Sequence, residues 1–422
     1  MLTIQKKLTN LFYVILGLPA TAMGFALSVQ IAVLSWILRT KYNLEIDQIG
    51  FVWAAGPIAG ILGQPIIGLI SDKVWFWGGR RKPFIIIGGI LAALMIFALP
   101  NIDRISDFFG IGSLMAVAIT VALTLDLSIN ISFNPTRSII ADVTPDGAPR
   151  TKGYTWMQSV SNLFGSVAYL VGALISNYFL IYVGVAVVLL FSLGPMFFIA
   201  EPRQLAKKEE EQPGTAASAG KTQWGQLFRL YFAHAFSWLG IQTMFIYIIA
   251  FLEQRIHPEN DSETGQMIGW SFFILNAVGS IWPAFLLEPL SKKIGRVRVH
   301  ILAVATMAIG YFGIVLFARD AFTLYLMMAV LTLGWAAVVS LPFAIMSEKV
   351  EKARMGFFMG IFNLSVVIPQ LVSSLFIGSV IRQAADKNIV FIISGVSLAL
   401  SALLWILVRD DSRKALKEKT AA

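Results

Sequence analysis

The chain has 422 residues, of which 57% are hydrophobic and only 14% are charged. A soluble domain carries roughly a quarter charged residues, so this composition excludes a soluble globular protein and indicates a polytopic membrane protein. The formal net charge of +9 does not indicate a nucleic-acid partner, because the basic residues lie in short loops beside apolar runs. The chain contains no cysteine, which excludes disulfides, thiolate metal sites and cysteine nucleophiles.

Twelve apolar runs of roughly 17 to 25 residues recur from end to end, each long enough to cross the hydrocarbon core of a bilayer. In lipid the backbone must satisfy its own hydrogen bonds, and runs of this length favour helices over the strands of a barrel. We therefore predict an all-α membrane protein of twelve transmembrane helices. The first run, 11–38, is longer than the core of a signal peptide, so we expect an uncleaved first span.

The lysines and arginines are distributed unevenly between alternate loops. If the N-terminus is inside, most of the 33 basic residues fall in segments on the cytoplasmic side. This bias predicts a multi-pass protein of the cell membrane with both termini in the cytoplasm.

The chain divides in the middle at a segment that is first charged and then rich in Gly, Ala, Ser and Thr. We predict an N-terminal six-helix half over 1–200, a flexible cytoplasmic linker over 201–226, a C-terminal six-helix half over 227–408 and a cytoplasmic tail over 409–422. Two loop sequences of the first half have counterparts in the second: "GLISDKVWFWGGRRKPF" with "EPLSKKIGRVRVH", and "SIIADVTPDGAPRTKG" with "AIMSEKVEKARMG". These echoes predict a parallel repeat, whose halves rock around a central site as in an alternating-access carrier.

The loop "SDKVWFWGGRRKPF" after the second span resembles the signature loop of the major facilitator superfamily, with extra residues between its acid and its arginines. Asp72 ends one helix and Arg80 and Arg81 begin the next, so they are predicted to latch the cytoplasmic side by charge-assisted hydrogen bonds. Asp142 and Glu348, which lie in the second pair of similar loop sequences, are also predicted to belong to this gate. In the alternative interpretation, the arginines only enforce topology. The second-half copy has Lys292 in place of the acid, so we expect a different latch there.

The fourth span, "LTLDLSINISFNPTRSIIAD", carries charges that a lipid-facing helix would not tolerate. At about 100° per residue, Asn130, Asn134 and Arg137 lie about 40°, 80° and 20° round from Asp126, so all four share one face. Ionised groups in lipid are costly, and this face is expected to point into the bundle. Asp126 and Arg137 are about 16 Å apart along a straight helix, too far for a direct ion pair.

This span is similar to the fourth span of the sucrose transporter and SLC45-like branch of the glycoside-pentoside-hexuronide:cation symporter group. The elements "WAAGPIAGILGQPIIGLISD", "GGRRKPFIIIG", "LPFAIMSE" and "GIFNLSVVIPQLVSSL" resemble the same branch. Asn134 and Thr136 depart from it, where the branch has Gly and a small residue beside the proline. The resemblance implies the major facilitator fold and transport of a disaccharide, sucrose- or maltose-like, with a cation.

Asp126 is the acid placed well inside a span, and burial favours the neutral form of a carboxyl, so we predict that it carries the coupled proton. The alternative is a structural acid hydrogen-bonded to neighbouring helices. Arg137 is predicted to contact the sugar or the coupling site. The alternative for Arg137 is a side chain that snorkels to the cytoplasmic surface.

Sugar recognition requires polar groups for hydroxyls and aromatic faces for C–H surfaces. The seventh span aligns His234, Trp238 and Gln242 at four-residue spacing as one polar-aromatic stripe, and we predict that these three residues bind substrate in the second half. Any single amide in a span can instead join two helices, and His234 alone is more typical of a structural role. The amides inside spans are Gln30, Gln64, Asn130, Asn134, Gln158, Asn162, Gln242, Asn276, Asn363 and Gln370. Of these we predict that Gln30, Asn130, Asn134, Gln242, Asn276, Asn363 and Gln370 bind substrate.

The sequence thus predicts a proton-coupled disaccharide importer that works as a monomer in the lipid bilayer, with a small sugar and protons as partners. No metal, cofactor or nucleic acid is expected, and no enzyme activity. The alternatives are a sodium-coupled sugar symporter, an exporter of drugs or metabolites, a sugar-binding sensor and an integral membrane transferase.

Overall fold

The computed structural model of the chain describes residues 5, 7–61, 70, 74–145, 148–202, 222–350 and 355–410. These residues are helical almost throughout, and in this part of the chain the β-pairing is one isolated bridge between Phe76 and Gly79. The prediction of an all-α protein is confirmed. By contacts the chain forms two compact units, Met1–Gln212 with Asn260–Trp270, and Pro213–Glu259 with Ser271–Ala422.

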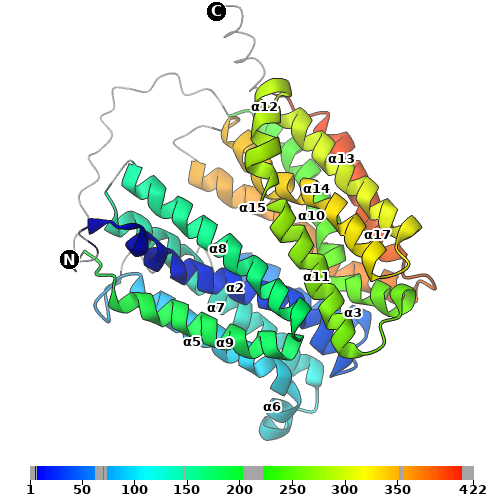
Figure 1. Cartoon of the computed structure of the whole chain (residues 1–422), viewed down its shortest axis with the longest axis horizontal. Coiled ribbons are helices and arrows are strands. Elements are labelled where there is room, and N and C mark those ends of the chain that lie inside the picture. The colour runs from blue at the N-terminus through cyan, green and yellow to red at the C-terminus, as the bar shows by residue number, and fades with distance from the viewer. Residues whose placement is uncertain are drawn as a thin grey trace, which may run out of the picture. The chain divides into compact units, whose positions relative to one another are not determined.

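The first unit runs from α2 to α9, drawn in blue to green in Figure 1. Its helices are α2 (Asn10–Thr40), α3 (Ile46–Trp53), α5 (Lys82–Ala98), the 3-10 helix η1 (Leu99–Asn101), α6 (Ile102–Phe109), α7 (Leu114–Val143), α8 (Ala148–Leu174), α9 (Asn177–Leu193) and the 3-10 helix η2 (Gly194–Phe197).

The second unit runs from α10 to α17 in the green-to-red part of the chain. Its helices are α10 (Trp224–Phe251), η3 (Leu252–Ile256), α11 (Asp261–Gly279), η4 (Pro283–Leu287), α12 (Glu288–Ile294), α13 (Arg296–Phe317), α14 (Ala321–Ser347), α15 (Met355–Val372), η6 (Ser373–Ile377), α16 (Gly378–Gln383) and α17 (Ile389–Trp405), of which η3, η4 and η6 are π-helices. The first residues of α11, up to Trp270, group with the first unit.

The described helices account for the predicted membrane spans. Eight helices in this part of the chain are long and apolar enough to cross a membrane, and two further apolar helices, Ile46–Ile61 and Ile389–Trp405, are shorter. The remaining two spans correspond to α8 and α11, of 27 and 19 residues, which carry more polar side chains. The described helices are therefore consistent with the twelve predicted spans.

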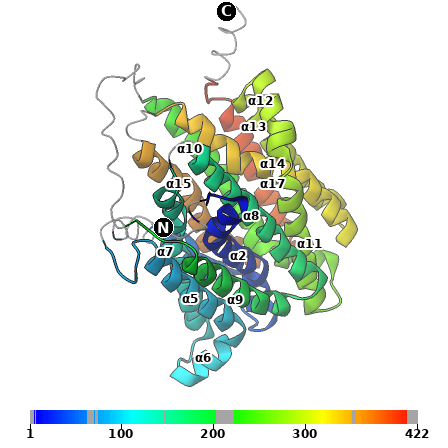
Figure 2. The same ribbon diagram turned by 60° about the vertical axis from the view of Figure 1, so that its left-hand side comes forward.

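The two units repeat the same internal packing. In the first, α2 packs against α8 and α9, and α5 packs against α7 and α9. In the second, α10 packs against α15 and α17, and α13 packs against α14 and α17. Figures 1 and 2 show α5 beside α9 in both views. Corresponding helices make corresponding contacts, which is the structural counterpart of the sequence echoes.

Short polar side chains fix where several helices begin. The hydroxyls of Thr9, Ser113 and Ser176 accept hydrogen bonds from backbone N–H groups in the first turns of α2, α7 and α9. Asp320 caps α14 in the same way, and hydrogen bonds from Thr323 lower the pKa of its carboxyl. Such caps satisfy amide groups that a helix cannot pair internally.

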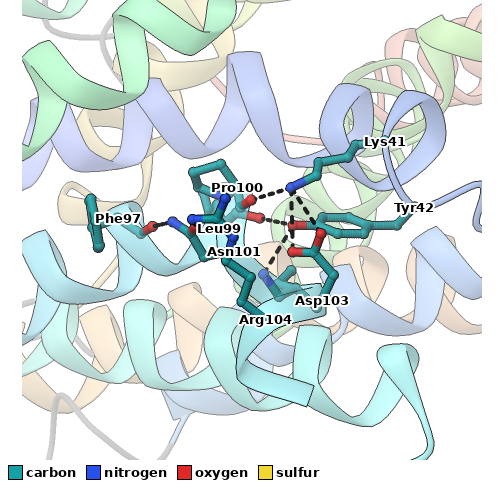
Figure 3. Close-up of polar contacts among 9 residues, drawn as sticks. Lys41, Tyr42, Phe97, Leu99, Pro100, Asn101, Asp103 and Arg104 are labelled. Carbon is teal, nitrogen blue, oxygen red and sulfur yellow. Dashed lines mark hydrogen bonds and ion pairs between the residues drawn. The ribbon is translucent and has the colours of Figure 1, made fainter. Parts of the chain in front are cut away.

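A polar cluster ties the end of α2 to the end of α5 within the first unit (Figure 3). The Tyr42 hydroxyl donates to the Leu99 carbonyl at 2.9 Å and accepts from the Ile102 N–H at 3.0 Å. The Lys41 ammonium forms an ion pair with Asp103 at 3.3 Å. Burial raises the pKa of the Tyr42 hydroxyl, so the group stays a neutral donor. These contacts fix η1 and α6 at one end of the unit.

The predicted linker, 201–226, lies mostly outside the described residues, as do Asp72, Gln64 and the tail beyond residue 410. The predicted boundaries of halves, linker and tail therefore stay predictions.

Candidate functional site

The Asp126 carboxyl lies inside the first unit, on α7, with 7% of the residue exposed. Gln30 of α2 donates its Nε2–H to Asp126 Oδ2 at 3.0 Å. Gly56, on the helix Ile46–Ile61, approaches the same carboxyl so closely that a Cβ there would lie 3.2 Å from Oδ2. Three helices thus enclose this acid.

Gln30 is itself incompletely satisfied. Its Oε1 is buried and has no hydrogen-bond partner among the described residues. A buried polar atom without a partner is costly, so this oxygen next to Asp126 marks a place where a donor can be accepted. A protonated carboxyl or a ligand hydroxyl would supply such a donor.

The other predicted residues of α7 differ in their environments. Asn130 is buried, and its Nδ2–H donates to the Asp126 carbonyl oxygen of its own helix at 2.8 Å. Asn134 is half-buried, whereas Arg137 is exposed and its guanidinium lies 4.8 Å from the centre of the Phe133 ring. Asp126 and Arg137 form no ion pair in the described part of the chain, as their spacing predicted.

The predicted polar-aromatic stripe of α10 is present in the second unit. Trp238 donates its Nε1–H to His234 Nε2 at 2.9 Å. The His234 ring is fully buried and stacks on Phe362 of α15, with centroids 4.8 Å apart and planes at 19°. His234 therefore positions Trp238 from inside the unit. Its predicted contact with substrate stays a prediction.

An amide pair continues this stripe. Gln370 of α15 donates its Nε2–H to Gln242 Oε1 on α10 at 3.3 Å. Trp335 of α14 stands edge-on to Trp238, with centroids 6.2 Å apart, and to Phe245 at 5.5 Å. Half-buried rings and linked amides thus meet on one side of α10. Trp335 was missed by the sequence prediction, although a tryptophan within an apolar span was a visible signal.

Two predicted amides lie apart from this group. Asn276, half-buried on α11, donates its Nδ2–H to the Phe272 carbonyl oxygen of its own helix at 2.9 Å. Asn363 is half-buried on α15. The structure joins neither to the Gln242–Gln370 pair through the contacts it shows.

The predicted gate contains a buried ion pair in the first unit. Arg81 Nε lies 3.1 Å from Asp142 Oδ2, and their side chains are only 7% and 10% exposed. Asp72, the acid expected to face the arginines, lies outside the described residues. Arg80, a predicted gate residue, donates its backbone N–H to Glu201 at 2.8 Å.

Glu201, which contacts the predicted gate residues Arg80 and Arg81, was missed by the sequence prediction. Its carboxylate also accepts the backbone N–H groups of Arg81 and Lys82 at 2.9 and 2.7 Å, and so caps the start of α5. A Cβ on Gly79 would collide with this carboxylate, which explains a glycine there. The position of Glu201 directly after the sixth span was the available signal.

The second unit repeats this arrangement. Arg296 forms an ion pair with Glu348, while Asp410 Oδ2 accepts the Val297 N–H at 3.3 Å at the start of α13. Gly295, with φ of +95°, again leaves room for the carboxylate. Lys292 instead pairs with Glu288 at 2.6 Å and lowers the pKa of that carboxyl. That these contacts act as a latch in the second half stays a prediction.

Comparisons with known proteins agree with this architecture. A family model described as Major Facilitator Superfamily matches residues 16–374 and 263–422. The sucrose transport protein SUT2 of Oryza sativa subsp. indica is 25% identical over 399 residues, covering 77% of this chain and 78% of its own length. SUC4 of Arabidopsis thaliana, also a sucrose transport protein, is 22% identical over 389 residues, covering 76% and 75%.

Solved structures show the same fold. The nucleoside transporter NupG matches with a TM-score of 0.71 at 15% identity, covering 95% of this chain and 99% of its own. The xylose transporter XylE from E. coli matches with a TM-score of 0.69 at 17% identity, covering 97% and 98%. The fold predicted from the sequence is confirmed.

Proposed function

The chain belongs to the major facilitator superfamily, and from this premise we propose that it is a secondary active transporter that imports a disaccharide together with a proton. The proposal of a sugar as substrate is supported by relatives that are named sucrose transport proteins over about three quarters of the chain. Sucrose and maltose are the substrates to test first.

The proposal of proton coupling is based on the enclosed Asp126 carboxyl. An ionised carboxylate that is cut off from water is unfavourable, whereas its protonated form is tolerated. Gln30 contributes an N–H donor for the ionised state and an unpartnered oxygen that can accept from the protonated state. The acid can therefore load and release a proton without a change in its neighbours.

The second unit offers the groups that a sugar ring requires. The half-buried rings of Trp238 and Trp335 present faces for sugar C–H surfaces, and the Gln242–Gln370 pair presents amide groups for hydroxyls. In the first unit, Asn134 and the exposed Arg137 are the proposed polar contacts on α7.

Transport proceeds by alternating access, in which the carrier exposes its site to one side of the membrane at a time. Sugar and proton act by binding one conformation more tightly than another and so shifting the population between them. Each unit contains one ion pair that holds its helix ends together: Arg81–Asp142 in the first unit and Arg296–Glu348 in the second. These pairs help each unit to move as a rigid body in this cycle.

Uptake into proteoliposomes tests the proposed function. Radiolabelled sucrose, maltose and trehalose are supplied to vesicles with an imposed inward proton gradient. We expect accumulation of at least one sugar that rises as the external medium is made mildly acidic and collapses with a protonophore. Uptake that follows sodium and ignores the protonophore would contradict proton coupling. Proton-driven efflux of drugs without any sugar uptake would contradict the importer, and turnover of a bound lipid would support a transferase instead.

The membrane topology is a separate prediction. We propose a monomer in the cell membrane with both termini in the cytoplasm. Because the chain has no cysteine, single Trp77→Cys and Phe108→Cys variants carry unique thiols at exposed positions. In right-side-out vesicles we expect an impermeant maleimide to label the Phe108→Cys variant alone, and inverted vesicles to reverse the pattern. The opposite labelling would invert the assigned orientation.

A further inference from the structure

Three different faces run along α8. At about 100° per residue, Met157, Val160 and Ala168 point in one direction, and all three are buried. This face packs against α2, where a Cβ on Gly17 would lie 2.9 Å from Met157 Cα. The packing fixes the rotation of α8 about its axis and so determines what its other faces meet.

A second face of α8 is apolar and exposed. Leu163, Val167 and Leu174 lie within about 40° of one another, and Leu163 and Leu174 are 62% and 61% exposed. Exposed leucines and valines on a membrane helix are the usual contact with lipid. This face is therefore the lipid side of α8.

The third face is polar and also exposed. Tyr154, Gln158 and Asn162 follow one another at four-residue spacing and lie about 180°, 140° and 100° round the helix from Leu163, so they form a face separate from the apolar one. Gln158 and Asn162 lie about 15 and 21 Å along the axis from the start of α8, which is near the middle of a bilayer core about 30 Å thick. Amides exposed to hydrocarbon at this depth are unfavourable, so this face meets water or substrate.

The two amides form an ordered pair. Gln158 Nε2–H donates to Asn162 Oδ1 at 2.8 Å. This bond uses one donor hydrogen and one acceptor lone pair, and leaves three donors and three acceptor lone pairs on the pair for a ligand. If oxygen and nitrogen are exchanged in both amides, the numbers of free donors and acceptors on the pair stay the same. Neighbouring hydroxyls of a sugar ring, each both donor and acceptor, fit such a set.

The amide pair belongs to a longer polar strip. The Tyr154 hydroxyl donates to the Arg137 carbonyl oxygen at 3.2 Å, so the polar face of α8 adjoins the part of α7 that carries the exposed Arg137. We propose that Gln158 and Asn162 bind adjacent hydroxyls of the transported sugar and help determine which sugar is carried. This inference rests on the proposed function and adds a binding element that the predicted site omitted.

The first test determines whether the polar face and the apolar face of α8 contact water or lipid. In the cysteine-free chain, a charged methanethiosulfonate reagent is expected to modify the Asn162→Cys variant and to leave the matched Leu163→Cys variant unmodified. A saturating concentration of the sugar selected by the uptake assay, sucrose, maltose or trehalose, is expected to slow modification of the Asn162→Cys variant. Absence of labelling, or labelling that a transported sugar does not slow, would overturn the inference.

The second test measures recognition. Gln158→Leu and Asn162→Leu are each expected to raise the KM for that sugar by about 3- to 10-fold, the effect of losing a neutral hydrogen bond. Analogues that lack one ring hydroxyl should bind more weakly to the wild type, and for one of them the penalty should vanish in these variants. Leu163→Ala, on the lipid face, is the control and should leave KM unchanged. Unchanged KM and unchanged analogue penalties would overturn the inference while leaving the proposed function intact, whereas a wild type that carries no sugar would overturn both.

Discussion

Replacement of Asp126 by Asn is expected to abolish accumulation of sugar against its gradient and to spare sugar exchange between the two sides of the membrane. Asparagine has nearly the shape of aspartate and can still accept the hydrogen bond from Gln30 Nε2, so the enclosed site and its packing are retained. It cannot bind and release a proton. Coupling should therefore be lost without loss of the fold.

The measurement compares two assays on the same proteoliposomes. Sugar counterflow, which needs no proton gradient, should continue in the Asp126→Asn variant, while uptake driven by an imposed pH gradient should stop at equilibration. Asp103→Asn is the control, because it removes an acid that pairs with Lys41 and not with Gln30. Concentrative, protonophore-sensitive uptake by the Asp126→Asn variant would show that another group carries the proton.

The packing around Asp126 gives a further check on this experiment. A Cβ added at Gly56 would stand 3.2 and 3.3 Å from the two oxygens of this carboxyl. A Gly56→Ala variant should therefore shift the carboxyl slightly and weaken the pH-gradient-driven rate more than counterflow. Equal loss in both assays would indicate a general packing defect.

Much of the architecture could be predicted from the sequence because hydrophobic runs of membrane-spanning length are a strong local signal. The charges of the fourth span could be placed on one helix face by periodicity alone. The distance between Asp126 and Arg137 along the helix axis could also be calculated from the rise per residue of an α-helix. Each of these inferences requires only the residues of a single segment, and these can be read directly from the sequence.

The partners of these residues could not be predicted in the same way. Glu201 caps α5 from 120 residues away along the chain and Asp410 approaches α13 from 113 residues away, so neither pairing has a local signal. The amides show the limits of periodicity most clearly. Asn130 and Asn276 turn back to their own helix backbones, whereas Gln242 and Gln370 meet across two helices. Side-chain rotamers and tertiary contacts decide between these outcomes.

The buried ion pair of the first unit is expected to be far more sensitive to mutation than its counterpart in the second. Arg81→Met leaves the Asp142 carboxylate buried without its cation, and removal of one partner of such a pair costs about 3–5 kcal/mol in the free energy of unfolding. The side chains of Arg296 and Glu348 are 39% and 30% exposed, so solvent screens their attraction. Arg296→Met is therefore expected to cost about 0–1 kcal/mol.

A double-mutant cycle separates the charge effect from the packing effect. The Arg81→Met/Asp142→Leu double variant removes both charges and should recover most of the stability that Arg81→Met loses, because the unpaired buried carboxylate is gone. Denaturant unfolding of the purified protein in micelles, followed by tryptophan fluorescence, measures all four forms. If Arg81→Met and Arg296→Met destabilise equally, or if the double variant is no more stable than Arg81→Met, burial does not determine the energetics of the pair. The capping contacts of Glu201 and Asp410, which are made to backbone N–H groups, would then be the main restraint on these helix ends.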